Sequence, residues 1–329
     1  MPDNLSAFVC RQLPLIEEQL RLQLPESSLE GTERLNEALR YAVSSGGSRC
    51  RPLLTLLAAE AFQAPPQQAL AVACGVEFLH ISSVILDDLP SMDDAKMRRH
   101  LPPLHLAFDG ATAILAALAL YTRAFEIFAL HAALVKQAAL AVGCNGMIGG
   151  QAADLRGVAG SRLMKTSALV RFALQAGAWA GSAPPDQLSA LGKIGDLMGE
   201  AYQLRDDLLD ALASESATGK TGGQDVRHNR RALTPECGVN AVFGRLEFLV
   251  KCAIETIRSQ FRRCVEAELL CEFAHSLLMR AKVLVHDNDP DSAGGSVLGI
   301  GCSQRSTVAA GETRRGETGG RPFSSDPRA

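Results

Sequence analysis

The sequence predicts an all-α protein, and three features of its composition indicate that class. Hydrophobic residues make up 47% of the 329-residue chain, enough for a sizeable core, whereas aromatic residues make up only 5%. Alanine and leucine are abundant and runs of β-branched residues are scarce, which favours helices over strands. No stretch shows the alternation of polar and apolar residues that is typical of a half-buried strand.

The composition changes near residue 285 and divides the chain in two. We expect a helical domain over residues 1–284 and a disordered tail over residues 285–329. The tail is rich in Gly, Ser, Arg and Asp. It therefore holds too little apolar surface to offset the entropy that ordering would cost. The formal net charge of −3 argues against nucleic acid as a partner.

Three features of the sequence predict a cytoplasmic protein without a transmembrane segment. Residues 1–9 lack the basic start and the long apolar stretch of a signal peptide. The longest uncharged run in the apolar middle of the chain, residues 110–122, is too short to span a bilayer. The nine cysteines include no CxxC pair, so we interpret them as reduced thiols.

The first informative helix is expected over residues 69–89, an apolar stretch that runs into the acidic sequence DDLPSMDD. Asp87 comes near its end, and Pro90 disfavours its continuation. An unbroken helix would place Asp94 on the same face as Asp87, whereas a bulge at Pro90 would bring Asp93 there instead. Helix geometry leaves both arrangements open.

Two further side chains share the face of Asp87. His80 precedes it by seven residues and Ser83 by four, which places Ser83 about 6 Å deeper along the helix axis. A single histidine on a helix is more often a core residue than a ligand-binding one. The acidic residues nearby favour a functional role instead, so the sequence leaves both interpretations of His80 open.

The second helix of interest carries glycines at helical spacing, in the sequence GCNGMIGGQAADL at residues 143–155. Gly143, Gly146 and Gly150 each cost roughly 1 kcal/mol relative to alanine inside a helix. We expect the close approach of another helix or of a ligand to explain them.

The third helix, expected over residues 186–212, ends in a second acidic sequence, RDDLLD. Asp206, Asp207 and Asp210 project from one side of it, and Gln203 shares that side. Three neighbouring carboxylates repel one another unless they are solvated or bind a cation. Mg²⁺ suits such a group because it takes a few carboxylates together with phosphate oxygens. Apolar residues along the helix favour the metal-binding interpretation over a solvated face.

Basic residues accompany both acidic sequences. Arg98 and Arg99 follow the first one, and Arg49 and Arg51 lie in the sequence GGSRCRP. Arginine grips phosphate through a planar fork of donors, although arginine pairs are often only solvated. Lys220, in ATGKTGG, does not complete a Walker motif but lies on a glycine-rich loop that could reach a phosphate. Together these residues indicate a diphosphate bridged by Mg²⁺.

Taken in order, these motifs resemble those of the trans-isoprenyl diphosphate synthases. The resemblance rests on GGSRCRP, FLHISSVILDDLPSMDDAKMRR, GMIGGQAADL, KTSAL, YQLRDDLLD and GKTGGQD, and it covers about residues 30–235. It implies an isoprenoid synthase-type bundle of helices around a central cavity, usually in a homodimer. Among the subfamilies, the chain is most similar to geranylgeranyl diphosphate synthases.

The resemblance also implies roles for individual residues, with three Mg²⁺ ions in each site. The metal ligands would be Asp87, Asp88, Asp93, Asp206, Asp207 and Asp210. Isopentenyl diphosphate would be bound by Ser48, Arg51, His80 and Arg99. The allylic diphosphate and the developing cation would meet Arg98, Lys165, Thr166, Gln203 and Lys220. The residues with direct catalytic roles would be Asp87, Asp88, Asp206, Lys165, Thr166 and Gln203.

The implied reaction is a Mg²⁺-dependent condensation of isopentenyl diphosphate with dimethylallyl, geranyl or farnesyl diphosphate. It proceeds by ionisation, condensation and elimination. The small side chains of Ser82 and Ser83 leave room below Asp87 and predict a C20 product, which replacement of Ser82 by Tyr or Phe should shorten. The alternatives are a class I terpene cyclase and a non-catalytic or weakly active regulatory subunit. Ser48 stands where the family has Lys, which favours the regulatory subunit slightly, and Leu118 stands where the family has Asp.

Overall fold

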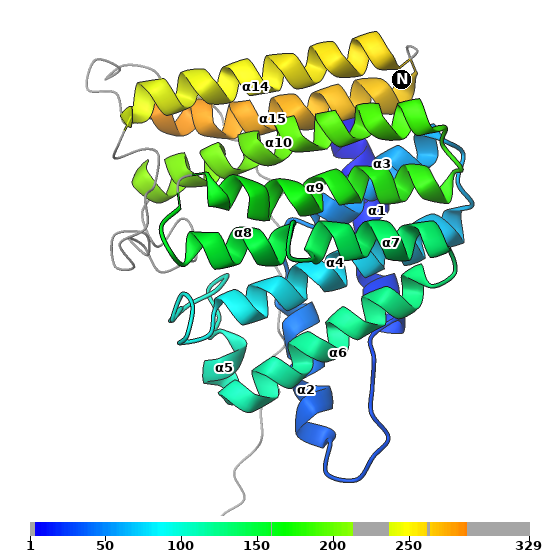
Figure 1. Ribbon diagram of the computed structural model, residues 1–329, viewed down its shortest axis with the longest axis vertical. Helices are drawn as coiled ribbons and strands as arrows, with labels where there is room; N and C mark the ends of the chain where they lie inside the picture. Colours follow the sequence, from blue (N-terminus) through cyan, green and yellow to red (C-terminus); the bar gives the residue numbers. More distant parts are fainter. Residues whose placement is uncertain (1–3, 159, 213–236, 262–263, 288–329) are drawn as a thin grey trace, which may run out of the picture. The chain divides into compact units, whose positions relative to one another are not determined.

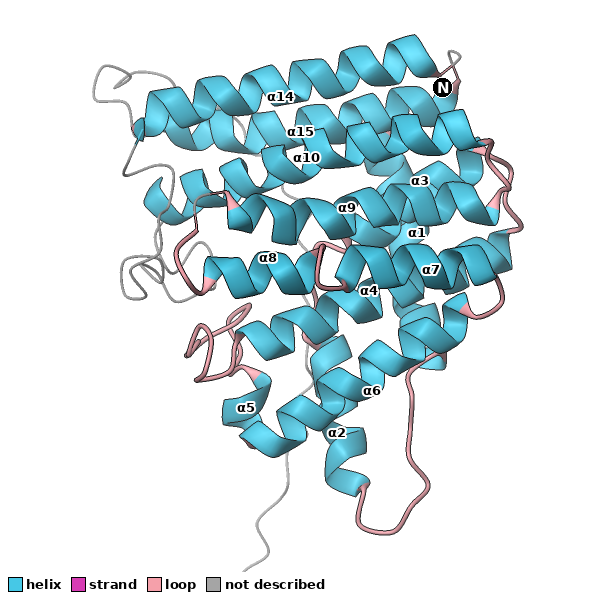
Figure 2. Ribbon diagram, in the orientation of Figure 1, coloured by secondary structure: helices cyan, strands magenta, loops and turns pink. Residues whose placement is uncertain are grey.

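The computed structural model describes residues 4–158, 160–212, 237–261 and 264–287, and it shows helices packed around a long central helix (Figure 1). All of the described residues lie within one compact unit, Met1–Pro290. The described part of the chain contains no strand; its one isolated β-bridge joins Arg98 and Leu101 (Figure 2). The predicted all-α class is therefore confirmed.

The helices differ in length from one turn to nearly eight turns. In chain order they are α1 (Leu5–Leu22), α2 (Glu33–Ser44), α3 (Cys50–Ala61), α4 (Pro66–Asp87), α5 (Leu104–Ala107), α6 (Gly110–Phe128), α7 (Ala132–Val142), α8 (Met147–Asp154), α9 (Ser161–Ala180), α10 (Pro185–Leu212), α14 (Val239–Gln260) and α15 (Val265–Asp287).

Helix α4 is the centre of the bundle and packs against α3, α6 and α9. It begins at Pro66, three residues before the predicted start, because a proline at the first position of a helix loses no hydrogen bond. It ends at Asp87, and Pro90 lies in the turn that follows. The helix is apolar on nearly all sides, which is typical of a helix enclosed by others.

Within the described part of the chain, three helical stretches are long and apolar enough to cross a membrane, judged by length and composition alone: α4, α6 and Ala132–Asp154. The sequence predicts none when only uninterrupted uncharged runs are considered, because these windows include a few charged residues. Inside the fold, 67% of the window in α4 is buried, compared with 39% in α6 and 28% in Ala132–Asp154.

Helices α9 and α10 lie side by side because glycines let their backbones come close (Figure 1). A Cβ atom on Gly195 would collide with the backbone of Arg171, and one on Gly199 would collide with the backbone of Ser167. This approach brings Thr166 of α9 to Gln203 of α10, whose Oε1 accepts a hydrogen bond from the Thr166 hydroxyl at 2.8 Å.

The predicted glycine-spaced helix is instead two helices. Gly143 ends α7 and Gly146 precedes α8, so neither glycine lies inside a helix. Gly150 does lie inside α8, and a Cβ atom there would be 2.6 Å from the backbone nitrogen of Lys165. The expected close approach of another helix is therefore correct for Gly150.

Helix α15 continues to Asp287, three residues beyond the predicted domain boundary. The predicted tail lies almost entirely outside the described residues, as does Lys220. The eight cysteines in the described part of the chain are all free thiols, in agreement with the sequence analysis, and Cys74 and Cys271 are buried.

Candidate active site

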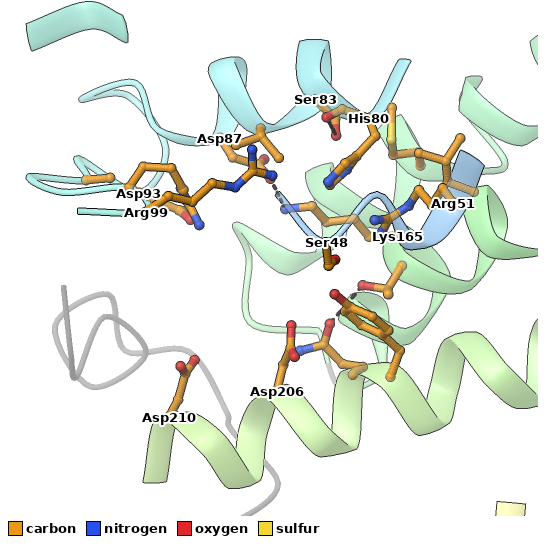
Figure 3. A pocket seen from close by; sticks show the side chains of 18 of the residues that line it. Ser48, Arg51, His80, Ser83, Asp87, Asp93, Arg99, Lys165, Asp206 and Asp210 are labelled. Atoms are coloured by element: carbon orange, nitrogen blue, oxygen red, sulfur yellow. Dashed lines mark hydrogen bonds and ion pairs between the residues drawn. The ribbon is translucent and has the colours of Figure 1, made fainter. Parts of the chain in front are cut away.

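A cavity of about 310 Å³ lies between the C-terminal half of α4 and the C-terminal half of α10 (Figure 3). Its walls combine acidic, basic and apolar side chains. The lining residues are Ser48, Arg51, His80, Ser83, Val84, Asp87, Asp93, Ala95, Met97, Arg98, Arg99, Met147, Lys165, Thr166, Leu169, Tyr202, Gln203, Asp206 and Asp210.

The first acidic sequence contributes Asp87 and Asp93 to the cavity. The turn after α4 folds back on the helix end, since the backbone nitrogen of Asp93 donates to the carbonyl of Asp87 at 2.9 Å. Asp94 has a left-handed backbone, with φ of 44°, and pairs with Lys96 at 2.8 Å outside the cavity lining. The structure thus places Asp93, and not Asp94, beside Asp87.

Asp88 does not line the main cavity, and its side chain is only 4% exposed. Both of its carboxylate oxygens accept hydrogen bonds from Nε of Arg98, at 3.0 and 3.2 Å, and Nη2 of Arg98 also donates to Oδ1. This bidentate pair orients the guanidinium of Arg98, which does line the cavity. Asp88 therefore contacts a predicted substrate-binding residue and not the cavity itself.

Asp87 meets Lys165 across the cavity, with 2.6 Å between its Oδ2 and the Nζ of the lysine (Figure 3). Burial raises the pKa of Asp87, and the ammonium of Lys165 acts in the opposite direction. Gly150 contributes to this contact because its lack of a side chain lets α8 pack directly on the backbone of Lys165.

The second acidic sequence contributes Asp206 and Asp210, which face Asp87 and Asp93 from the opposite wall (Figure 3). Asp207 is 4% exposed and is not a lining residue. Its Oδ1 accepts a hydrogen bond from Nε2 of Gln203 at 2.9 Å. The expectation that all three aspartates of this helix share one side is therefore wrong for Asp207, which is rotated about 100° from Asp206.

The basic residues gather on the side of the cavity formed by α3, the end of α4 and the turn after it. Arg51, Arg98 and Arg99 all line it, together with Ser48 and His80. Burial lowers the pKa of His80, and the nearby charges of Arg51 and Arg99 lower it further. His80 is therefore a neutral hydrogen-bonding group in this pocket at physiological pH.

Of the two serines that were predicted to form the floor, only Ser83 lines the cavity. Ser82 is 1% exposed and packs within the bundle. The two residues are neighbours on α4, so they point in directions about 100° apart. We therefore expect a substitution at Ser83, and not one at Ser82, to limit product length.

Sequence reasoning assigned no role to Tyr202, although this residue lies one turn before Asp206. Its ring lines the cavity, with the guanidinium of Arg205 3.9 Å and that of Arg51 5.8 Å from the ring centroid. The four-residue spacing to Asp206 was the available signal. The apolar lining residues Val84, Met147 and Leu169 carried no signal of their own.

The donor set of the cavity fits Mg²⁺ that is bound together with a diphosphate. Among the described residues, no three His, Cys, Asp or Glu side chains are close enough to hold an ion by themselves. Two pairs of carboxylates instead face one another across a cavity that also contains arginine and lysine. Mg²⁺ usually takes one or two carboxylates and completes its shell with water and substrate phosphate.

Known proteins are similar to this chain in sequence and in fold. Residues 32–235 match the family model described as polyprenyl synthetase. Farnesyl diphosphate synthase of Geobacillus stearothermophilus is 34% identical over 250 residues, which cover 70% of this chain and 84% of that protein. Geranylgeranyl diphosphate synthase of Cyanophora paradoxa is 30% identical over 273 residues, which cover 77% of this chain and 90% of that protein.

A solved structure shows the same architecture. The geranyltransferase of Helicobacter pylori, in complex with magnesium and isoprenyl diphosphate, superposes with a TM-score of 0.73 at 26% sequence identity. The superposition covers 85% of this chain and 98% of the geranyltransferase.

Proposed function

The chain belongs to the polyprenyl synthetase family and is a trans-prenyltransferase, and we propose that it joins isopentenyl diphosphate to an allylic diphosphate in a Mg²⁺-dependent reaction. The observation that carries this proposal is the composition of the cavity. Two pairs of carboxylates face each other, and Arg51, Arg98, Arg99 and Lys165 line the same cavity. Four cationic side chains beside four carboxylates suit two diphosphate substrates better than one.

The carboxylates that we propose as metal ligands are Asp87, Asp93, Asp206 and Asp210, because these four line the cavity. When bound, Mg²⁺ would act as a Lewis acid that neutralises the departing diphosphate, and we propose three ions per site. Asp88 and Asp207, which were also predicted as ligands, contact protein side chains in this structure. We propose that these two residues act through those side chains.

The allylic diphosphate would lie near Lys165 and Arg98. Asp87 holds the ammonium of Lys165 at 2.6 Å, and Asp88 holds the guanidinium of Arg98. Both cations are therefore oriented towards the cavity before the substrate arrives, and they can donate to phosphate oxygens not bound to metal. Preorganised donors of this kind stabilise the charge that develops on a leaving group.

The isopentenyl diphosphate would lie near Arg51, Arg99, His80 and Ser48. The neutral imidazole of His80 can donate one hydrogen bond to a phosphate oxygen without adding charge. Ser48 contributes a hydroxyl where the motif that GGSRCRP resembles has a lysine, so this site would have one cation fewer. We expect its affinity for isopentenyl diphosphate to depend strongly on the two arginines.

The reacting carbons would lie between the residues proposed for the allylic diphosphate and those proposed for isopentenyl diphosphate. Loss of the diphosphate leaves an allylic cation, which the double bond of isopentenyl diphosphate attacks, and the departing diphosphate takes up the proton that is lost. The side chains of Thr166 and Gln203 are fixed by hydrogen bonds to each other and to Asp207, so their oxygen atoms are held at the cavity wall. Val84, Met147 and Leu169 keep water from the cation.

We propose a C20 product, geranylgeranyl diphosphate, because a serine at position 83 leaves space beneath the metal-binding end of α4. The names of the relatives include both farnesyl and geranylgeranyl diphosphate synthases, so family membership alone does not choose between C15 and C20.

The test is a product assay on the purified protein with Mg²⁺, farnesyl diphosphate and labelled isopentenyl diphosphate. A labelled C20 diphosphate is the expected result. A hydrocarbon made from the allylic substrate alone would instead identify a terpene cyclase. Absence of product, together with altered output from an added active synthase, would identify a regulatory subunit, the function that Ser48 would favour.

We also propose that the protein is a homodimer and works in the cytoplasm. Large apolar side chains lie exposed on α6, α7 and α8, and a second copy would cover them. They are Ile114, Leu115, Leu118, Leu140 and Ile148. The molar mass in solution, measured by light scattering, should be twice that of the 35.0 kDa chain.

A further inference from the structure

Arg49 and Arg51 lie two residues apart in one basic sequence, but the fold separates their side chains. Arg51 lines the cavity, whereas the side chain of Arg49 has no exposed surface. Burying a charged guanidinium is costly unless partners are present. The position of Arg49 therefore needs a structural explanation that binding of a substrate does not supply.

The guanidinium of Arg49 is held by three other helices. Its Nε and Nη2 donate to the carboxylate of Glu17 on α1, at 2.8 and 3.2 Å. Its Nη1 donates to Oε1 of Glu77 on α4 at 3.0 Å, and Nη2 also donates to the carbonyl of Val43 on α2 at 2.7 Å. Burial acts to lower the pKa of Arg49, but the charges of Glu77 and Glu17 reverse this effect and raise it.

Arg49 also closes a sharp turn between α2 and α3. Its backbone is left-handed, with φ of 46° and ψ of 33°, and it follows Gly46 and Gly47, whose φ angles are 77° and 141°. A non-glycine residue seldom adopts this conformation unless other contacts stabilise it. The hydrogen bonds of the buried guanidinium are such contacts, so they fix the conformation of the turn.

The turn forms one wall of the basic half of the cavity. The carbonyl of Gly46 accepts a hydrogen bond from Nη1 of Arg99. A Cβ atom on Gly47 would lie 2.8 Å from Cζ of Arg99, so the backbone rests directly on that guanidinium. Ser48 and Arg51 follow in the chain, and both line the cavity.

We propose that Arg49 is a positioning residue for the isopentenyl diphosphate pocket, which it orients through the turn that carries Ser48 and Arg51 and supports Arg99. Glu17 and Glu77 hold Arg49 in place, and Arg49 itself contacts neither substrate. Glu77 lies three residues before His80 on α4. Its contact with Arg49 therefore also sets the position of the turn between α2 and α3 relative to His80. The proposal rests on the proposed function, because it takes the basic side of the cavity to be the isopentenyl diphosphate pocket.

Replacement of Glu77 separates this role from direct binding of the substrate by Arg49. If Arg49 bound the diphosphate directly, loss of a competing carboxylate would strengthen binding and lower the KM for isopentenyl diphosphate. If Arg49 positions the turn, the same loss weakens its anchor and raises that KM. The two roles therefore predict changes of opposite sign.

The experiment compares the full-length wild-type enzyme with Glu77→Gln in steady-state assays in which each substrate is varied in turn. Glutamine keeps the size and one acceptor oxygen of Glu77, and it replaces the other oxygen with an uncharged NH2 group. We expect the KM for isopentenyl diphosphate to rise about tenfold, the effect of weakening one charge-assisted hydrogen bond. The KM for the allylic diphosphate and kcat should change less than about twofold, whereas a general loss of folded protein would lower kcat alone.

The matched control is Glu18→Gln, which makes the same chemical change on α1 at an exposed residue that pairs with Arg21. It should leave both KM values unchanged. If Glu77→Gln unfolds the protein, Glu17→Gln tests the same prediction, because the Glu17 side chain is 35% exposed and tolerates the change better.

An unchanged or lower KM for isopentenyl diphosphate in an active Glu77→Gln enzyme would overturn the positioning role, as would an equal rise for both substrates. An inactive wild-type protein would instead refute the proposed function, so the two failures are distinguishable.

Discussion

The two neighbouring aspartates at the end of α4 should respond differently to the same substitution. Asp87 lines the cavity and is proposed as a metal ligand, whereas Asp88 is 4% exposed in its side chain and pairs with Arg98. Each is changed to asparagine, which keeps the shape and removes the charge. We expect Asp88→Asn to lower stability and Asp87→Asn to abolish the response to metal.

The size of the stability effect follows from the contacts of Asp88. Removing one partner of a buried ion pair costs about 3–5 kcal/mol. Because the side chain of Arg98 keeps 24% of its surface exposed, the lower bound applies, about 3 kcal/mol. For a chain of 329 residues the entropy of unfolding is about 0.7 kcal/mol/K, so that loss lowers the Tm by about 4 °C. Asp87→Asn removes the partner of Lys165, but burial raises the pKa of Asp87, so the fold already disfavours its charge. Asp87→Asn should therefore lower the Tm less than Asp88→Asn does.

The assay is thermal unfolding of the metal-free protein and of the protein with Mg²⁺ and inorganic diphosphate. A ligand at 100 times its Kd adds about 2.7 kcal/mol to the free energy of unfolding. The wild-type protein and Asp88→Asn should both gain Tm when the two ligands are added, whereas Asp87→Asn should gain almost none. If Asp88→Asn unfolds at the wild-type temperature but loses the gain from Mg²⁺ and diphosphate, Asp88 is a metal ligand and the assignment fails.

Three further predictions concern acid sensitivity, product length and helix packing. Burial and the nearby arginines lower the pKa of His80, so below pH 6.5 the unfolded chain binds a proton that the folded chain does not, and the free energy of unfolding should fall by up to about 1.4 kcal/mol per pH unit. Chemical denaturation at pH 7.0 and 5.5 measures this loss, which should be smaller in His80→Gln than in the wild-type protein. An equal loss in both proteins would contradict the prediction. Ser83→Phe should shorten the product from C20 to C15 because Ser83 lines the cavity, whereas Ser82→Phe should lower stability by about 1–3 kcal/mol through overpacking. Chromatography of the products decides this, and a shortened product from Ser82→Phe alone would contradict it. Gly150→Ala places a Cβ atom 2.6 Å from the backbone nitrogen of Lys165, so it should lower the Tm and raise the KM for the allylic diphosphate. Gly244→Ala, with nothing within 4 Å, is the control and should raise the Tm slightly, since alanine favours the helix.

The helices that carry the site could be predicted from sequence because their signals are local. The apolar residues at 69–89 and the long stretch at 186–212 correspond to α4 and α10, with ends that differ by at most three residues. The split between α7 and α8 was missed because regularly spaced glycines fit a helix and a helix break equally well.

The arrangement of charges could not be predicted, because it depends on partners that are distant in sequence. Arg49 and Arg51 belong to the same short motif, and only the positions of Glu17 and Glu77 make one arginine buried and the other accessible. The choice between Asp93 and Asp94 likewise depends on how the turn after Pro90 folds back onto the end of α4.

In each acidic sequence, one of the two adjacent aspartates faces the cavity and the other faces the protein, which explains why the aspartate is doubled. Adjacent residues on a helix point about 100° apart, so only one aspartate of each pair can face the cavity. The second aspartate faces the protein, where Asp88 holds Arg98 and Asp207 holds Gln203. Arg98 and Gln203 both line the cavity, so each pair supplies one carboxylate to the cavity, where we propose a cation, and one that orients a side chain of the cavity wall. A substitution at the second aspartate should therefore act on the substrate through that side chain and leave the carboxylates at the cavity in place.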